Sequence, residues 1–215
     1  MMTQLSTQHG SQLVSELVTV IKSNRDYLSE IDGAIGDGDH GINMAKGFTL
    51  CGEQLNERQS LAEAFDTLSD ALMEGIGGSM GPLYGSFFMG MADNIRSKST
   101  LTANDFAAML RAGLTELQDI SEAGVGDKCL MDTLIPAVET AEQRADEGYT
   151  VMLQAIRNAA RQGRDSTKDL VAKIGRASRL GERSRGVLDA GAVSCCLLLE
   201  QMAASAQQQL LAETA

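Results

Sequence analysis

The chain has 215 residues, 43% of them hydrophobic, which suits one well-buried domain or at most two small ones. Its formal net charge of −11 argues against a nucleic-acid-binding protein, because such proteins need an excess of lysine and arginine to neutralise phosphates. No apolar run approaches the ~20 residues of a membrane-spanning helix, and the polar first ten residues lack the layout of a signal peptide. We therefore expect a cytoplasmic protein, with one domain over residues 1–215, that binds neither nucleic acid nor membranes.

The four cysteines lack the C-x-x-C spacing of zinc sites and redox motifs. Cys195 and Cys196 are neighbours inside an apolar run, and Cys51 and Cys129 stand apart from them. We expect all four to be reduced, buried thiols, as is typical of a reducing compartment.

The hydrophobic pattern predicts helices along the whole chain. Apolar residues recur at helical spacing through the first 30 residues. Pro82 is well placed to begin a helix, since proline is tolerated in a first turn. Another plausible cap comes from Thr102, Asn104 and Asp105. Strand-like alternation is essentially absent, so we expect an all-α domain and not an α/β fold. Further helical patterns cover residues 42–56, 61–75, 82–97, 103–120, 129–145, 150–162, 166–175 and 190–211.

Glycines gather in four of the expected connections, at residues 33–41, 75–85, 124–126 and 175–191. In an antiparallel bundle the connections at alternate turns lie at the same end, so these four loops are expected to meet. Because glycine lets the backbone approach a ligand closely, the clustering predicts a binding site at one end of the bundle.

The loop "IGDGDHG" (residues 35–41) satisfies the G-x-G-x-x-G pattern of dinucleotide-binding loops, but its context argues against that function. The pattern must follow a buried strand, and here it follows the end of an amphipathic helix. An EF-hand would need glycine at Ile42 and glutamate at Phe48. A Walker A loop is excluded because the chain contains no G-K-[ST].

Three carboxylates remain in and before this loop, those of Asp32, Asp37 and Asp39. Residues two apart in extended chain point to the same side, so these groups can converge, and their mutual repulsion requires a cation. Oxygen ligands favour magnesium over manganese or calcium. The next helix is expected to begin near Gly41 or Ile42, with free N–H groups that face an anion. The alternative, a solvated turn in which His40 only caps a helix, stays open.

The other glycine loops also carry candidate ligand groups. The segment "GIGGSMGPLYG" precedes the helix begun by Pro82, where glycine allows close backbone approach or only a flexible connection. Arg176 lies in a basic stretch that is either a solvated face or a phosphate contact. Asp127 and Lys128 stand at the start of another expected helix.

Four segments in this order, spanning nearly all of the chain, carry a resemblance to a known family. They are "IDGAIGDGDHGINMAKGF", "GGSMGPLYGSFF", "GDKCLMDTLIP" and "GRASRLGERSRGVLDAGA". They resemble the landmark segments of the L subunit of dihydroxyacetone kinases, a domain that also forms the nucleotide-binding half of single-chain dihydroxyacetone kinases. The resemblance implies a single-domain barrel of about eight antiparallel amphipathic helices with the nucleotide site in the loops at one end.

The resemblance also implies a ligand set. Two magnesium ions would bridge Asp32, Asp37 and Asp39 to the phosphates of ADP or ATP. The nucleotide itself would contact His40, Gly41, Ile42, Asn43, Ser79, Met80, Leu130, Arg176, Asp189 and Gly191.

The implied activity is phosphoryl transfer in which this chain does little covalent work. The sugar, dihydroxyacetone or a related ketose, would lie on a separate kinase subunit. A phosphohistidine-carrying subunit would rephosphorylate ADP that stays bound as a coenzyme, or the same pocket would exchange ATP and ADP. A homodimer is left open, as are a nucleotide-sensing protein without phosphotransfer and a metal-dependent phosphatase. The departures from the family pattern are Met80, Ser121 and "VLDAGA" in place of "HQDPGA".

Overall fold

The computed structural model describes residues 4–212, and this range is almost entirely helical. The α-helices are α1 (Ser11–Ser23), α2 (Arg25–Ile35), α3 (His40–Gln54), α4 (Leu61–Gly75), α5 (Met80–Ile95), α6 (Ala103–Ile120), α7 (Met131–Arg144), α8 (Tyr149–Ser166) and α9 (Ala190–Ala212). The short elements are the 3-10 helices η1 (Ala145–Glu147), η2 (Thr167–Asp169) and η3 (Arg176–Ser184) and the antiparallel strands β1 (Leu5–Ser6) and β2 (Thr100–Leu101). Across residues 4–212, none of the helices combines the length and apolar character that a membrane span requires.

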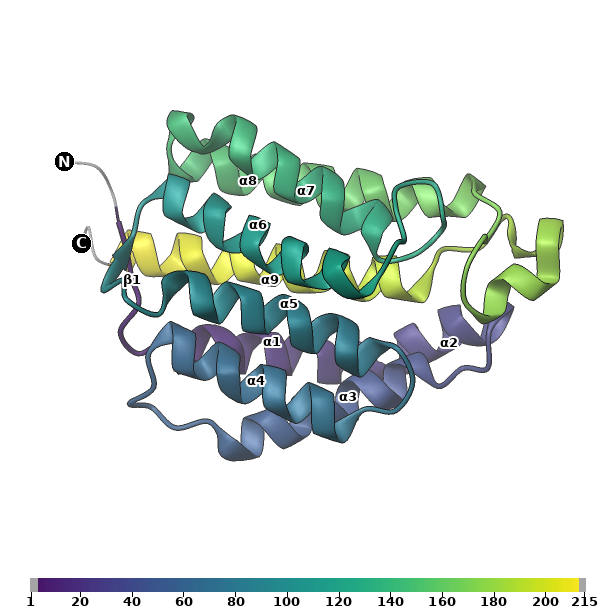
Figure 1. Ribbon diagram of the computed structural model, residues 1–215, viewed down its shortest axis with the longest axis horizontal. Coiled ribbons are helices and arrows are strands. Elements are labelled where there is room, and N and C mark those ends of the chain that lie inside the picture. The colour runs from purple at the N-terminus through teal and green to yellow at the C-terminus, as the bar shows by residue number, and fades with distance from the viewer. Residues whose placement is uncertain (1–3, 213–215) are drawn as a thin grey trace.

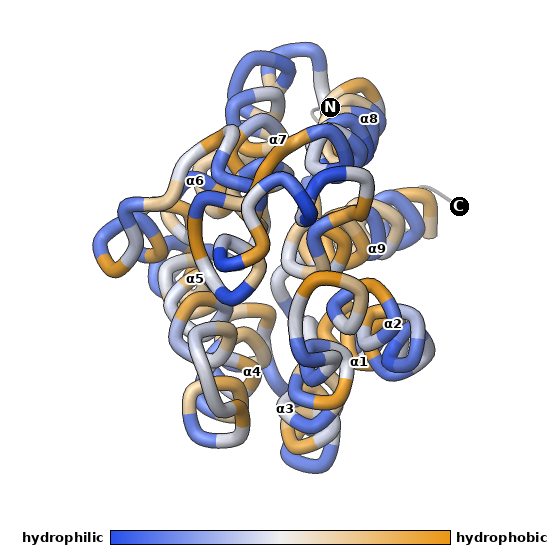
Figure 2. The backbone as a smooth tube through the Cα atoms, turned by 90° about the vertical axis from the view of Figure 1, so that its right-hand side faces the viewer, coloured by the Kyte–Doolittle hydropathy of each residue, from blue (hydrophilic) through white to orange (hydrophobic). Residues whose placement is uncertain are grey.

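Eight of these helices form a closed ring. In the order α1, α3, α4, α5, α6, α7, α8 and α9, each helix packs against the next, and α9 returns to α1 (Figures 1 and 2). Neighbouring helices are antiparallel, and their inward faces share one hydrophobic core. The shorter α2 continues beyond α1 and packs against α3 at one end of the ring. The predicted all-α barrel is therefore confirmed.

Local signals explain where several helices begin. Ser60 accepts a hydrogen bond from the backbone N–H of Glu63, whose carboxylate accepts one from Ser60 in return. The same capping box joins Thr102 and Asp105, two of the three residues predicted to supply a cap here, and Thr102 is the N-cap. Such reciprocal caps satisfy backbone donors that the helix leaves unpaired.

Two predicted helices differ from the structure. The single N-terminal helix is divided at Asn24 into α1 and α2. The helix predicted over residues 166–175 is wrong, because α8 ends at Ser166 and only η2 follows before the chain becomes irregular. The backbone N–H groups of Ala172 and Lys173 bond to Ser184 and Asp127 instead of to the preceding turn. Hydrogen bonds to such distant partners do not change the spacing of apolar residues, so the hydrophobic pattern could not predict this irregular stretch.

The ring places four helix N-termini at one end, which we call the site end. The glycine-rich connections precede α3, α5, α7 and α9 and lie together there, on the right in Figure 1 and facing the viewer in Figure 2. The two ends of the described chain lie at the opposite end. The unpaired N–H groups and positive dipole ends of four helices therefore point toward one region.

Glycine also permits a close helix contact in the ring. A Cβ atom built on Gly113 of α6 would lie 2.6 Å from the carbonyl oxygen of Phe87 in α5. Real Cβ atoms do not approach backbone atoms so closely, so a side chain at this position would push α5 and α6 apart.

Gly113→Ala is therefore expected to lower the free energy of unfolding by about 1–2 kcal/mol in urea denaturation. Overpacking costs about 1–3 kcal/mol and exceeds the gain in helix propensity of about 1 kcal/mol. Gly77→Ala is the matched control, since its Cβ would meet nothing within 4 Å. Equal stability of the two variants would contradict the steric argument.

Candidate functional site

Three carboxylates converge at the site end. Asp32 lies in the last turn of α2, and Asp37 and Asp39 lie in the loop that leads to α3. One oxygen from each lies within 4.8 Å of the others, and all three side chains are at least partly exposed. Among residues 4–212 this is the one group of three or more potential metal ligands. We call it the acidic cluster.

The glycines of the loop make room for this cluster. A Cβ atom at Gly36 would lie 2.4 Å from Oδ1 of Asp32, so the missing side chain leaves space for that carboxylate. Gly38 has a φ of +78°, a conformation that other residues rarely adopt. The donor set is oxygen alone, which fits a hard divalent cation such as magnesium. The glycines of this loop therefore leave the space and the backbone freedom that the acidic cluster needs.

Arg176 reaches the acidic cluster from a distant segment. It is the first residue of η3, and its guanidinium forms an ion pair with the carboxylate of Asp37. Its side chain remains 61% exposed. The structure therefore brings this predicted phosphate contact to the metal ligands, where it neutralises part of their charge.

The remaining predicted nucleotide contacts all lie at helix N-termini of the site end. Leu130 and Gly191 are adjacent, since a Cβ on Gly191 would lie 3.5 Å from Cβ of Leu130. Leu130 is only 3% exposed, whereas Ile42 is 52% exposed. The residues are His40, Gly41, Ile42 and Asn43 in α3, Ser79 and Met80 at α5, Leu130 before α7, and Asp189 and Gly191 at α9.

His40 points into the protein core. Its side chain is 7% exposed, and Nε2 lies 3.0 Å from Oγ of Ser194 in α9. Burial lowers the pKa of His40 to about 4, although the nearby charge of Asp32 opposes this shift. The imidazole is therefore neutral at pH 7, and it does not cap α3. Only the backbone N–H of His40 faces the acidic cluster, donating to Oδ2 of Asp32 at 3.3 Å.

Asp189 caps the last helix of the ring. Its Oδ2 accepts a hydrogen bond of 2.8 Å from the backbone N–H of Ala192. Desolvation by the surrounding protein raises the pKa of Asp189 to about 6, despite this bond and the nearby Lys128. The Asp189 carboxylate therefore stabilises the N-terminus of α9.

Lys128 ties two parts of the site end together, a role that sequence reasoning did not assign. It is 2% exposed and has a φ of +64°. Its Nζ donates hydrogen bonds of 2.5 Å to the carbonyl oxygens of Thr167 and Val187. Burial lowers the pKa of this ammonium group. The bond to Val187 holds the segment of residues 170–188, which we call the cap segment, against the α6–α7 loop, and the bond to Thr167 holds η2 against the same loop.

The α6–α7 loop has its own internal anchor. Asp132 is 1% exposed and accepts backbone hydrogen bonds from Gly126 at 2.6 Å and Cys129 at 2.7 Å. Sequence reasoning missed Asp132 because a single acidic residue in a first turn reads as an ordinary helix start.

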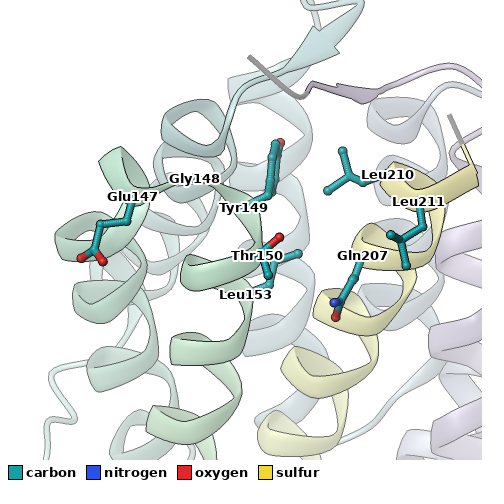
Figure 3. A pocket seen from close by; sticks show the side chains of 8 residues that line it. All are labelled: Glu147, Gly148, Tyr149, Thr150, Leu153, Gln207, Leu210 and Leu211. Atoms are coloured by element: carbon teal, nitrogen blue, oxygen red, sulfur yellow. The ribbon is translucent and has the colours of Figure 1, made fainter. Parts of the chain in front are cut away.

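A hollow of about 300 Å³ lies at the opposite end of the ring, between α8 and α9. Figure 3 shows Tyr149, Thr150 and Leu153 from α8 and side chains of α9 around it. Glu147 is the only ionisable residue in its lining apart from the Tyr149 phenol. The hollow therefore lacks the group of carboxylates that makes the acidic cluster the better candidate for the functional site.

Lys128→Met is expected to loosen the cap segment, because two carbonyl groups lose a charged donor. The loss should be about 2–4 kcal/mol of unfolding free energy, with faster hydrogen exchange over residues 167–188. Lys168→Met, which alters an exposed side chain in η2, should change neither measurement. Unchanged exchange in the Lys128 variant would show that these bonds do not hold the segment.

The comparisons with known proteins agree with this architecture. The DAK2 domain family model matches residues 34–204. The chain is 37% identical to "PEP-dependent dihydroxyacetone kinase 2, ADP-binding subunit DhaL" of Listeria innocua, over 87% of this chain and 89% of that protein. It is 32% identical to the corresponding subunit of Escherichia coli, over 88% of this chain and 92% of that protein.

A solved structure shares the fold. The dihydroxyacetone kinase of C. freundii, solved in complex with AMP-PNP and Mg²⁺, superposes with a TM-score of 0.69 and 23% identity. The match covers 91% of this chain and 33% of that longer chain. The matched family, the relatives and the four-loop site end lead to one assignment: the chain belongs to the DAK2 domain family, with the DhaL-type ADP-binding subunits of dihydroxyacetone kinases.

Proposed function

We propose that this chain is the ADP- and magnesium-binding phosphotransferase subunit of a dihydroxyacetone-type kinase. The observation that carries the proposal is the acidic cluster placed beside four helix N-termini. Carboxylates that hold a cation, next to backbone donors that hold an anion, are suited to a metal–phosphate ligand. The ADP-binding relatives support a nucleoside diphosphate as that ligand, and the C. freundii neighbour supports magnesium.

In this proposal Asp32, Asp37 and Asp39 hold two magnesium ions. When bound, magnesium neutralises phosphate charge and links the carboxylates to the phosphate oxygens. The N–H groups at the start of α3 and α5 bind the phosphates, including those of Gly41 and Ser79. Backbone donors placed in this way stabilise negative charge without reorganising during the reaction.

Arg176 and the α7 and α9 N-termini complete the proposed pocket. The Arg176 ion pair with Asp37 supports a role close to the phosphates, because the same guanidinium can pair with a phosphate oxygen. In this proposal the adjacent, buried residues Leu130 and Gly191 form the apolar floor beneath the ribose or base. The neighbouring Asp189 shapes this surface by capping α9.

The phosphoryl group would pass from a phosphohistidine-carrying subunit, through ADP bound here, to a ketose on a separate kinase subunit. The relatives named as PEP-dependent ADP-binding subunits support this route. We place the protein in the cytoplasm with these partners. The exchange of ATP for ADP is the alternative route, and direct measurement separates the two.

Asp37→Asn should abolish magnesium-dependent binding of ADP in isothermal titration calorimetry, since one ligand and one charge are lost from the acidic cluster. Asp70→Asn is the matched control, because Asp70 is an exposed aspartate of α4. Full binding by the Asp37 variant would refute the metal site. Failure of the unaltered protein to bind ADP with magnesium would refute the proposed function.

The retention of nucleotide distinguishes the routes of phosphoryl transfer. We expect the purified chain to carry about one ADP, detected by mass spectrometry after acid extraction, and to exchange it slowly with excess ATP. Adding the phosphohistidine-carrying and sugar-binding subunits should then transfer labelled phosphate to dihydroxyacetone. Rapid exchange would favour the ATP-dependent route, and bound ADP without any transfer would indicate a regulatory protein.

A further inference from the structure

The first two turns of α9 contact the N-terminal turns of three other helices through buried side chains. Ser194 of α9 is fully buried and lies next to His40 of α3 and Tyr84 of α5. Thr133 of α7 is also fully buried, and its Oγ1 donates to the carbonyl oxygen of Ala192 at 3.1 Å. Hydrogen bonds therefore connect α3, α5 and α7 to α9, and these are the four helices whose N-termini meet at the site end.

Ser194 is the centre of this network. Its Oγ lies 3.0 Å from Nε2 of His40, 2.8 Å from the hydroxyl of Tyr84 and 3.0 Å from the carbonyl oxygen of Gly191. Tyr84 is 2% exposed, so all three side chains are shielded from water. Each buried polar group here must find its partner inside the protein.

Distances and proton counts together favour one direction for each bond. A hydroxyl has one hydrogen to donate, and the carbonyl of Gly191 can only accept; Ser194 is the nearer of its two hydroxyl donors, at 3.0 Å against 3.4 Å for Tyr84, so the carbonyl takes the hydrogen of Ser194. The Tyr84 hydroxyl lies 2.8 Å from Ser194 but 3.4 Å from Gly191, so it donates to Ser194. The oxygen of Ser194 then accepts from His40 as well, which places the ring proton of His40 on Nε2.

The network fixes the spacing of these helix N-termini. The free N–H groups of several first turns can bind one ligand together only when the helices hold a constant spacing. Hydrogen bonds in a dry environment are stronger than in water and hold the helix ends at that spacing. A site whose donors are already in place loses less free energy to ordering when the ligand binds.

We infer that the His40–Ser194–Tyr84 network, with Thr133, positions the N-termini of α3, α5, α7 and α9 for the phosphates, with Ser194 as its centre and the His40 proton on Nε2. The inference rests on the proposed nucleotide site and adds positioning residues, Ser194, Tyr84 and Thr133, that do not themselves touch the ligand. It also assigns the His40 side chain to positioning, while its backbone remains at the site.

The binding test uses nucleotide-free protein and calorimetric titration with ADP and magnesium at pH 7. Tyr84→Phe should weaken binding about fivefold, the worth of about one hydrogen bond, and Ser194→Ala should weaken it further, by at least about tenfold, because it removes three. Thr133→Val, which keeps the shape of the side chain, should also weaken binding. If Ser194→Ala does not fold, the two gentler variants still test the inference.

Tyr149→Phe is the matched control for Tyr84→Phe. Its hydroxyl is also buried and shares its hydrogen between the carbonyl oxygens of Leu101 at 2.8 Å and Thr102 at 2.9 Å, at the opposite end of the ring. Both variants should lose similar unfolding free energy, but only the Tyr84 variant should lose ADP affinity. Equal affinities in the two variants would overturn the inference, because the network would then serve stability alone.

A spectroscopic measurement tests the network without nucleotide. The chain has 2 histidines, so His9→Gln leaves His40 as the single imidazole in a ¹⁵N NMR spectrum. We expect the proton on Nε2 at pH 7, with a changed tautomer balance after Ser194→Ala. A proton on Nδ1 in the unaltered network would overturn the assignment. If the unaltered protein shows this tautomer but binds no ADP, the proposed function fails while the network geometry stands.

Discussion

The convergence of four positive helix ends on three carboxylates is the interaction on which the rest of this structure depends. Each of the four helix N-termini carries about half a positive charge, but the C-termini of α2, α4, α6 and α8 lie at the same end and carry about half a negative charge each. The guanidinium of Arg176 therefore offsets only part of the charge of Asp32, Asp37 and Asp39. A divalent cation would offset the rest, and the free N–H groups of the helix N-termini then act as donors to a polyphosphate. The site therefore becomes attractive to phosphates when metal is present.

The ring topology makes this convergence unavoidable. When eight antiparallel helices close into a ring, every second helix begins at the same end. The chain needs only to place its ligand residues in the connections before α3, α5, α7 and α9 to bring them together. This is why segments separated by more than 100 residues, such as those of Asp37 and Arg176, meet in the fold.

The buried polar groups perform a different task from the exposed ones. Lys128 and Asp132 bond to backbone groups of the surrounding loops, and Ser194 links three helices. Unpaired polar groups in such dry positions would cost free energy, so each geometry is closely specified. The exposed carboxylates and Arg176 remain accessible because their neighbours are held in place by these interior bonds.

Much of this could be predicted from the sequence. The apolar period predicts nearly all of the helices, because each helix buries one face against a common core. The spacing of Asp32, Asp37 and Asp39 among glycines predicts the acidic cluster, because local backbone geometry alone brings the carboxylates together. The glycine clusters before alternate helices predict that four loops meet, since this follows from an antiparallel order of helices.

Other features were decided by tertiary structure alone. The part of the cap segment before η3 is irregular because Ala172 and Lys173 bond to groups far away in the chain, which no local pattern records. His40 looked like a ligand or a cap, yet burial directs its ring to Ser194, 154 residues away. The sequence by itself determined which residues form helices and which carboxylates cluster, since both depend on neighbours in the chain. Only the closed ring decided which polar groups are buried together, because those partners exist only after the helices have packed.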